Sequence, residues 1–141
     1  MSQASRAVET TASPEQVWLV WSDTSTWPAW NPDINWVKLE GPFADGTSGT
    51  METKSGGKHN ISLSGVQANR EFTLTSDLPM PATKLHFRCA IEPTAAGSRI
   101  SQGVTVKGLF GFMGGQIGAR ITPSFEPLLN GLKATVEGGA G

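Results

Sequence analysis

The chain has 141 residues, with 11 basic and 12 acidic side chains and a formal net charge of −1. This length predicts one domain, residues 1–141, and the balanced charge without a basic stripe argues against a nucleic-acid partner. The single cysteine, Cys89, excludes an internal disulfide and offers no cluster of ligands, so we expect neither a metal nor a cofactor. No stretch approaches the roughly 20 apolar residues that cross a bilayer, and no signal-peptide core is evident, so we expect a cytoplasmic protein without membrane insertion.

The first predicted elements are a strand and a helix. Residues 5–11 alternate in polarity, which predicts an edge strand with Val8 and Thr10 facing inward. Ser13 then starts a helix, because its hydroxyl can accept from free backbone N–H groups. Pro14 suits the first helical position, and Gln16 has the spacing of a capping box.

The next segment is rich in tryptophan. All five tryptophans of the chain lie between Trp18 and Trp36. Asp23 can cap a second short turn ending at Trp27-Pro28, and residues 30–33 predict an extended bend, because residues that precede proline avoid helix. An indole ring buries a large apolar surface but keeps one N–H donor. The cluster therefore indicates either a packed corner of the core or the wall of a ligand site.

Six further strands are predicted in succession, separated by short turns that suit antiparallel hairpins. They comprise residues 34–40, 47–54, 58–66, 70–76, 83–92 and 98–107. With the first strand they make a seven-stranded antiparallel sheet. Alternation predicts a wet face that carries Lys84, His86 and Arg88, and a dry face that another element must cover.

The element that covers the dry face of the sheet is predicted at the C-terminus. Apolar residues recur there at steps of three or four, as in an amphipathic helix. They are Met113, Ile117, Ile121, Phe125, Leu128, Leu132 and Val136. Pro123 and Pro127 each remove a backbone donor, so we expect a kink near residues 122–125. The glycines between Gly108 and Gly118 leave open whether this segment begins as a loop or as a helix.

The motif S-P-E-x-V-W…W-S-D…W-P-x-W-N-P-D-I, together with this order of elements, resembles the START-like or SRPBCC (Bet v 1-like) superfamily. The resemblance covers essentially the whole chain and looks closest to the bacterial polyketide cyclase/dehydrase-like branch. It implies an α+β helix-grip fold: a seven-stranded curved antiparallel sheet wrapped around a long C-terminal helix, with two short helices after the first strand. It also implies a hydrophobic cavity between sheet and helix.

If the sheet curves as the resemblance implies, its inward positions form the wall of that cavity. The expected ligand-binding residues are Met51, His59, Ile61, Leu63, Phe72, Leu74, Leu85, Phe87, Cys89, Gln102, Val104, Met113, Ile117 and Ile121, and Thr53 and Ser76 share their faces. A mostly apolar set with a few polar groups is typical of a small-molecule site. The alternative is that these side chains fill a solid core.

Three polar residues are weak candidates for catalysis. An inward His59 could serve as acid or base, or could sit at a strand end in contact with water. Gln102 could orient a ligand oxygen, or bond a neighbouring backbone group. Arg120 could meet a ligand carboxylate at the cavity mouth, or extend into solvent. Cys89, on the dry face between apolar neighbours, is predicted to be a core residue rather than a nucleophile.

Two segments are candidate gates of the cavity. The hairpin of residues 77–82 places Leu78 and Met80 at an exposed tip, where apolar side chains either close over a site or pack on the body of the protein. The glycine-rich stretch of residues 108–118 is expected to lie beside it.

Three functions remain open because fold does not dictate function. The first is binding of a small hydrophobic molecule, whether lipid, aromatic or polyketide-like. The second is a polyketide cyclase or dehydratase, in which the polar candidates assist enolisation or proton transfer. The third is a protein-interaction module of the co-chaperone kind. The expected oligomeric state is a monomer or homodimer.

Overall fold

The computed structural model describes residues 4–54, 57–77, 82–108 and 111–139. The strands are β1 (Ala4–Thr10), β2 (Ile34–Leu39), β3 (Ser48–Thr53), β4 (Gly57–Gln67), β5 (Glu71–Asp77), β6 (Thr83–Pro93) and β7 (Ser98–Gly108). The helices are α1 (Pro14–Trp21), α2 (Trp27–Trp30), α3 (Gly114–Ile121) and α4 (Phe125–Gly139). Short 3₁₀ turns lie at Thr24–Thr26, Gly111–Met113 and Thr122–Ser124.

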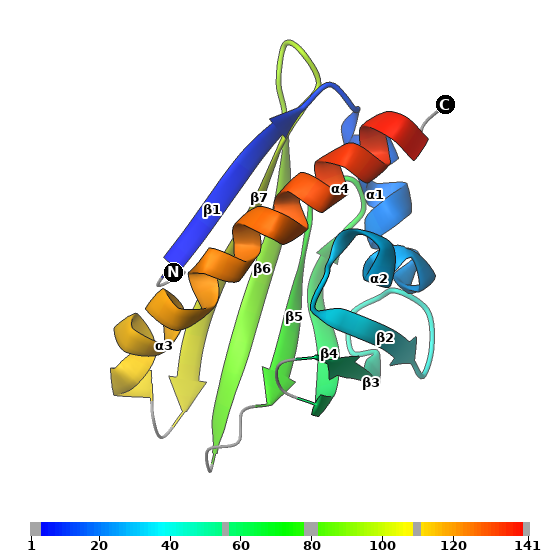
Figure 1. Ribbon diagram of the computed structural model, residues 1–141. Helices are drawn as coiled ribbons and strands as arrows, with labels where there is room; N and C mark the ends of the chain where they lie inside the picture. The colour runs from blue at the N-terminus through cyan, green and yellow to red at the C-terminus, as the bar shows by residue number, and fades with distance from the viewer. Residues whose placement is uncertain (1–3, 55–56, 78–81, 109–110, 140–141) are drawn as a thin grey trace.

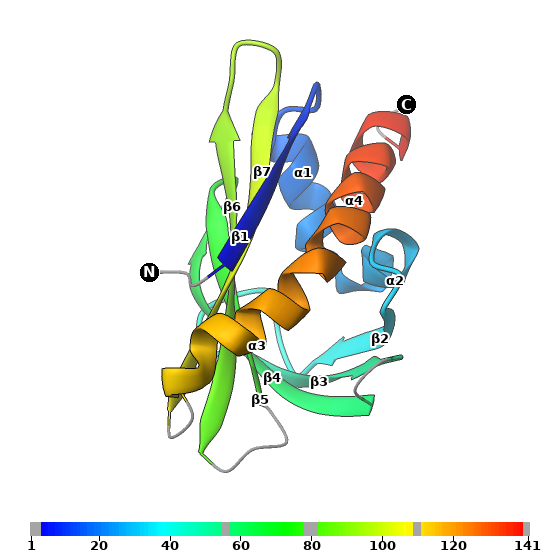
Figure 2. The ribbon, with the colours of Figure 1, turned by 60° about the vertical axis from the view of Figure 1, so that its left-hand side comes forward.

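The strands form one antiparallel sheet in the order β1-β7-β6-β5-β4-β3-β2. Strands β2 to β7 follow one another as a meander, and β1 pairs with β7 at the opposite edge. Helix α4 crosses the sheet diagonally (Figure 1), and the β2, β3 and β4 end of the sheet curls under the helices (Figure 2). This confirms the predicted α+β helix-grip fold, with a curved seven-stranded sheet around a long C-terminal helix.

Local sequence explains where the first helices begin. Ser13 Oγ accepts from the Gln16 N–H at 3.2 Å, and the Ser13 N–H donates to Gln16 Oε1 at 2.8 Å, which completes the predicted capping box. Asp23 caps the following 3₁₀ turn by accepting from the Ser25 N–H. This turn ends at Thr26 with Trp27 as its C-cap, close to the predicted end at Trp27-Pro28, but the helical backbone was wrongly expected to stop there. A proline in the first turn of a helix loses no intrahelical hydrogen bond, so α2 continues through Pro28.

The C-terminal segment is helical but interrupted. Helices α3 and α4 are separated by the 3₁₀ turn Thr122–Ser124, which is the predicted kink around Pro123. Residues 111–121 form a 3₁₀ turn and a helix, so the loop alternative was wrong for residues 111–118 of the glycine-rich stretch. The tip residues Leu78 and Met80, predicted to form a gate, lie outside the described residues.

The core lies between the sheet and the helices. Leu85, Cys89 and Ile91 of β6 are buried on the inner face, whereas Lys84 and Arg88 are exposed on the outer face, as alternation predicted. The inner face meets the apolar stripe of α4, whose Leu132 is fully buried. None of the described helices has the length and apolarity needed to cross a bilayer.

Four of the five tryptophans help to build one corner of this core. Phe72 of β5 lies at the centre, with its ring 5.0 to 6.2 Å from the rings of Phe43, Trp18, Trp21 and Trp27. The Trp27 ring in turn lies 5.7 Å from that of Trp30. We call Trp18, Trp21, Trp27, Trp30, Phe43 and Phe72 the aromatic cluster. It packs α1 and α2 against the sheet and bounds one end of the internal space.

Candidate functional site: a cavity between the sheet and the C-terminal helices

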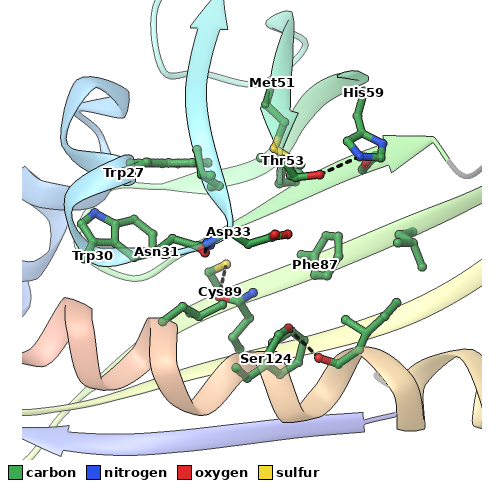
Figure 3. A pocket seen from close by; sticks show the side chains of 18 of the residues that line it. Trp27, Trp30, Asn31, Asp33, Met51, Thr53, His59, Phe87, Cys89 and Ser124 are labelled. Atoms are coloured by element: carbon green, nitrogen blue, oxygen red, sulfur yellow. Dashed lines mark hydrogen bonds between the residues drawn. The ribbon is translucent and has the colours of Figure 1, made fainter. Parts of the chain in front are cut away.

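A cavity of about 560 Å³ lies between the inner face of the sheet and the kinked C-terminal helices. Strands β3 to β7 contribute one wall, α2 and residues 31–34 an end, and residues 120–128 the other wall. Figure 3 shows Trp27 and Trp30 toward one end and His59 with Thr53 toward the other. Most of the lining is apolar, as expected of a site for an apolar molecule.

Most of the predicted wall residues do line this cavity. They are Met51, His59, Phe72, Leu74, Leu85, Phe87, Cys89, Gln102 and Ile121, together with Thr53, Ser76 and the candidate Arg120. They come from six separate elements of the chain, which surround one cavity because the sheet is curved (Figure 2).

Five predicted wall residues do not line the cavity. Ile61, Leu63 and Val104 face inward but belong to the packed core and do not border the cavity. Ile117 packs against the same core, and Met113 belongs to the 3₁₀ turn before α3. Alternation identifies the inner face of a strand correctly, but it does not tell which inner positions meet empty space.

Other lining residues were not predicted: Trp27, Trp30, Asn31, Asp33, Ile34, Ser124, Phe125 and Leu128. Two signals pointed to part of this set. The tryptophan-rich run allowed a ligand wall as one alternative, and Phe125 and Leu128 belong to the same helical stripe as Ile121. No pattern in the sequence predicted that residues in the range 31–34 line the cavity. Their position depends on the bend of the chain after α2.

A chain of polar side chains stands at the His59 end of the cavity. Thr53 Oγ1 lies 3.2 Å from His59 Nε2, and Asp77 Oδ1 lies 3.4 Å from His59 Nδ1. The other carboxylate oxygen of Asp77 accepts from the Asn60 amide at 3.4 Å. Thr53, His59 and Asp77 come from β3, β4 and β5, so the pairing of three adjacent strands assembles the group.

A second polar point is the pair of Cys89 and Gln102 on β6 and β7. The Cys89 thiol donates to Gln102 Oε1 at 3.7 Å. Complete burial raises the pKa of this thiol far above its usual range, so it keeps its proton and acts as a donor. Because the Gln102 Oε1 atom already accepts from the thiol, the amide nitrogen is the group left for a ligand. Its two N–H groups can donate to an acceptor of a ligand in the cavity.

Two exposed polar residues of the lining lie beside the C-terminal kink. Arg120 and Ser124 both line the cavity and are both exposed to solvent. Among the described residues, Arg120 has no hydrogen bond or ion pair. An exposed guanidinium in the cavity lining suits an anionic or strongly polar part of a ligand.

The second histidine lies away from the cavity. His86 is on the outer face of β6, where Thr75 Oγ1 lies 3.1 Å from its Nδ1. Burial, followed by the charges of Lys107 and Lys84, lowers the pKa of this imidazole. Within the described parts of the chain, no three His, Cys, Asp or Glu side chains gather as a metal site.

A curved sheet that grips a kinked helix around an internal cavity defines the helix-grip class of ligand-binding folds. A family model described as polyketide cyclase / dehydrase and lipid transport matches residues 1–137. The chain therefore belongs to this family, within the Bet v 1-like or SRPBCC proteins, as its motifs suggested.

Similar solved structures share the fold over nearly the whole chain. A protein of Mesorhizobium loti, MLL2253, aligns with a TM-score of 0.76 at 14% identity and covers 95% of this chain and 96% of its own. Ara h 8.0201 has a TM-score of 0.71 at 14% identity, over 96% and 97% of the two chains. A Thalictrum flavum norcoclaurine synthase mutant, solved with a transition-state analogue, has a TM-score of 0.73 at 13% identity, over 98% and 95%. No curated protein matches the sequence.

Proposed function

We propose that this protein binds a small, largely apolar molecule, of lipid, aromatic or polyketide-like character, in the cavity between the sheet and the C-terminal helices. The observation that carries the proposal is the cavity of about 560 Å³ with its mostly apolar lining. Its volume falls in the range of roughly 300–1,000 Å³ that is usual for such sites. Membership of a family described by lipid transport and polyketide cyclisation supports the same ligand class. A cytoplasmic location and a monomeric or homodimeric state stay predictions.

A cavity-filling variant tests this proposal. Phe87 lines the cavity, and its ring packs edge-on against Phe125 at 6.3 Å, so Phe87→Trp places a larger ring in the space a ligand would occupy. We expect wild type to bind the uncharged dye N-phenyl-1-naphthylamine saturably. The variant should bind it about tenfold more weakly, which corresponds to about 1.4 kcal/mol. Dye fluorescence titration measures both.

The matched control is Leu19→Trp, which adds a ring at a position that is 71% exposed and does not line the cavity. Its dye affinity should equal that of wild type, and the thermal melts of both variants should show that the fold is kept. Equal dye binding by wild type and Phe87→Trp would mean that the dye sits elsewhere. Absence of saturable binding to wild type would contradict the proposal itself.

The orientation of the Gln102 amide predicts that, among apolar ligands, those with a hydrogen-bond acceptor bind more tightly than those without one. If its N–H groups meet a ligand oxygen, Gln102→Leu should weaken 2-acetylnaphthalene binding about fivefold, because a neutral hydrogen bond contributes about 1 kcal/mol. The affinity of 2-ethylnaphthalene, which has the same size but no acceptor, should not fall. Calorimetric titration of both ligands gives the comparison. Cys89→Ser keeps a donor for Oε1 and should retain the preference, whereas equal losses for both ligands would contradict it.

A second candidate function is favoured by one observation. His59, Gln102 and Arg120 come from three separate elements, yet all line one cavity, where they would assist a cyclase or dehydratase reaction on a polyketide-like chain. Mass spectrometry of the ligand after incubation separates the two candidates. A carrier returns the ligand unchanged, whereas a cyclase or dehydratase returns an isomer or a product lighter by one water.

A further inference from the structure

The two histidines of the chain differ in their surroundings. Each lies near a threonine hydroxyl: Thr53 for His59, at 3.2 Å, and Thr75 for His86, at 3.1 Å. His59 also has the Asp77 carboxylate 3.4 Å from its second nitrogen and lines the cavity. His86 faces outward, and the charges that act on it are those of Lys107 and Lys84. The chain thus contains a threonine–histidine–carboxylate group at the cavity and an outer threonine–histidine pair for comparison.

The partners of His59 determine which of its nitrogens carries the proton. Asp77 Oδ1 lies 3.4 Å from Nδ1, an ion-pair distance without an aligned hydrogen bond, and a carboxylate at this place favours the tautomer that carries its proton on Nδ1. Nε2 is then a bare acceptor, and the Thr53 hydroxyl donates to it. Thr53 Oγ1 has a longer alternative contact, 3.5 Å, to the carbonyl oxygen of Gly57. This is the tautomer in which an imidazole can take a proton from a hydroxyl.

The surroundings of Thr53, His59 and Asp77 favour a catalytic role for these three side chains over a purely structural one. Thr53 and His59 both line the cavity, with the His59 side chain only 16% exposed. Asp77, at the end of β5, is 34% exposed, and the Asn60 amide holds its second oxygen. Nucleophile, base and orienting carboxylate thus stand in sequence at the edge of an apolar space, within the looser distances usual for catalytic groups without a ligand.

We propose that Thr53, His59 and Asp77 form a nucleophilic relay that hydrolyses an acyl ester or thioester held in the cavity. Thr53 Oγ1 attacks the carbonyl carbon while its proton passes to His59 Nε2. The bond to the leaving alcohol or thiol breaks, and that group takes the proton. Water then attacks the acyl-threonine through the same base, releasing a carboxylic acid and restoring the hydroxyl. Asp77 stays a carboxylate and acts as a positioning residue for the imidazole. The inference rests on the proposed binding function, because the acyl chain has to enter the same cavity.

Covalent labelling tests the relay directly. An octyl fluorophosphonate loses fluoride to an activated hydroxyl and leaves a stable adduct, which intact-protein and peptide mass spectrometry locate. We expect one adduct per chain, on Thr53, in wild type and in Thr53→Ser, and none in Thr53→Val. His59→Gln should slow labelling about 100-fold, the lower end of the usual contribution of general base catalysis.

Hydrolysis of p-nitrophenyl octanoate tests the role of Asp77. Asp77→Asn should lower kcat about tenfold or more while KM stays unchanged, because the variant loses the orientation of the imidazole but not the cavity. Thr75→Val and His86→Gln, which alter the outer pair, should match wild type in both assays. The dye titration described above reports on binding for every variant.

The outcomes separate the two proposals. Saturable dye binding with no adduct on Thr53, or with equal labelling in Thr53→Val or His59→Gln, would overturn the relay and leave the binding function standing. Absence of dye binding to wild type would count against the binding function, whatever the labelling result. An adduct on Thr53 that depends on His59 would support the relay.

Discussion

Phe72→Ala is expected to lower the free energy of unfolding by about 4 kcal/mol, within the range of roughly 3–5 kcal/mol for removing a core phenylalanine. Phe72 is 2% exposed, and its ring touches four other rings of the aromatic cluster. These neighbours come from α1, α2 and the segment after β2, so their relaxation into the vacated space is limited. Urea unfolding followed by tryptophan fluorescence and circular dichroism measures the loss.

The matched control for this prediction is Leu19→Ala. Leu19 belongs to α1 but is 71% exposed, so its truncation should change the free energy of unfolding by less than about 0.5 kcal/mol. Since typical domains have only about 5–15 kcal/mol in total, the Phe72 variant would stand close to unfolding. A typical point mutation lowers the free energy of unfolding by about 1 kcal/mol. A smaller loss than this in Phe72→Ala would show that the aromatic cluster relaxes into the vacated space and is not rigid.

Gly131→Ala is expected to destabilise the protein by about 2 kcal/mol, although alanine is the better helix former by about 1 kcal/mol. A Cβ at position 131 would stand 2.3 Å from the carbonyl oxygen of Trp30 and 3.1 Å from its carbonyl carbon. Both are backbone atoms of α2, which cannot rotate away as a side chain can. The clash therefore has to push α2 and α4 apart, and thermal unfolding should show the cost.

The same helix offers the control. Gly138, also in α4, has nothing within 4 Å of its added Cβ, so Gly138→Ala should leave stability unchanged or raise it by up to about 1 kcal/mol. Because Trp27 and Trp30 of α2 line the cavity, Gly131→Ala should also weaken dye binding, whereas Gly138→Ala should not. A Gly131 variant as stable as wild type would mean that the two helices are free to separate at this point.

Features that depend on neighbours along the chain could be predicted from the sequence. The capping box of Ser13 needs only the spacing to Gln16, and the kink at residues 122–124 follows from the missing donor of Pro123. The wet and dry faces of β6 follow from strict alternation. The end of the helical segment was wrongly predicted at Pro28. Proline usually ends a helix, and the sequence does not show that Pro28 lies in the first turn of a new one.

The contacts of His59 with Thr53 and Asp77 were not predictable, although the inward position of His59 was. Asp77 alternates with the buried Ser76, so its position in β5 assigns it to the outer face, where Asn60 contacts it. Its carboxylate nonetheless lies 3.4 Å from His59 Nδ1, a proximity that alternation along β5 does not predict. Thr53 meets Nε2 through the pairing of β3 with β4. Such contacts depend on strand register, which period-two alternation leaves free.

The extent of the cavity depends on tertiary structure for a further reason. The sequence determines which side chains face inward, since periodicity alone sets that, and it thereby indicates the fold and most of the wall. Whether an inner residue meets a neighbour or empty space depends on how far the sheet curls and where the helix bends. Leu63 of β4 is 1% exposed and lies in the packed core, whereas Leu74, paired with it on β5, lines the cavity. Two residues with the same pattern thus have different roles, because packing in three dimensions separates positions that a one-dimensional period treats as equal.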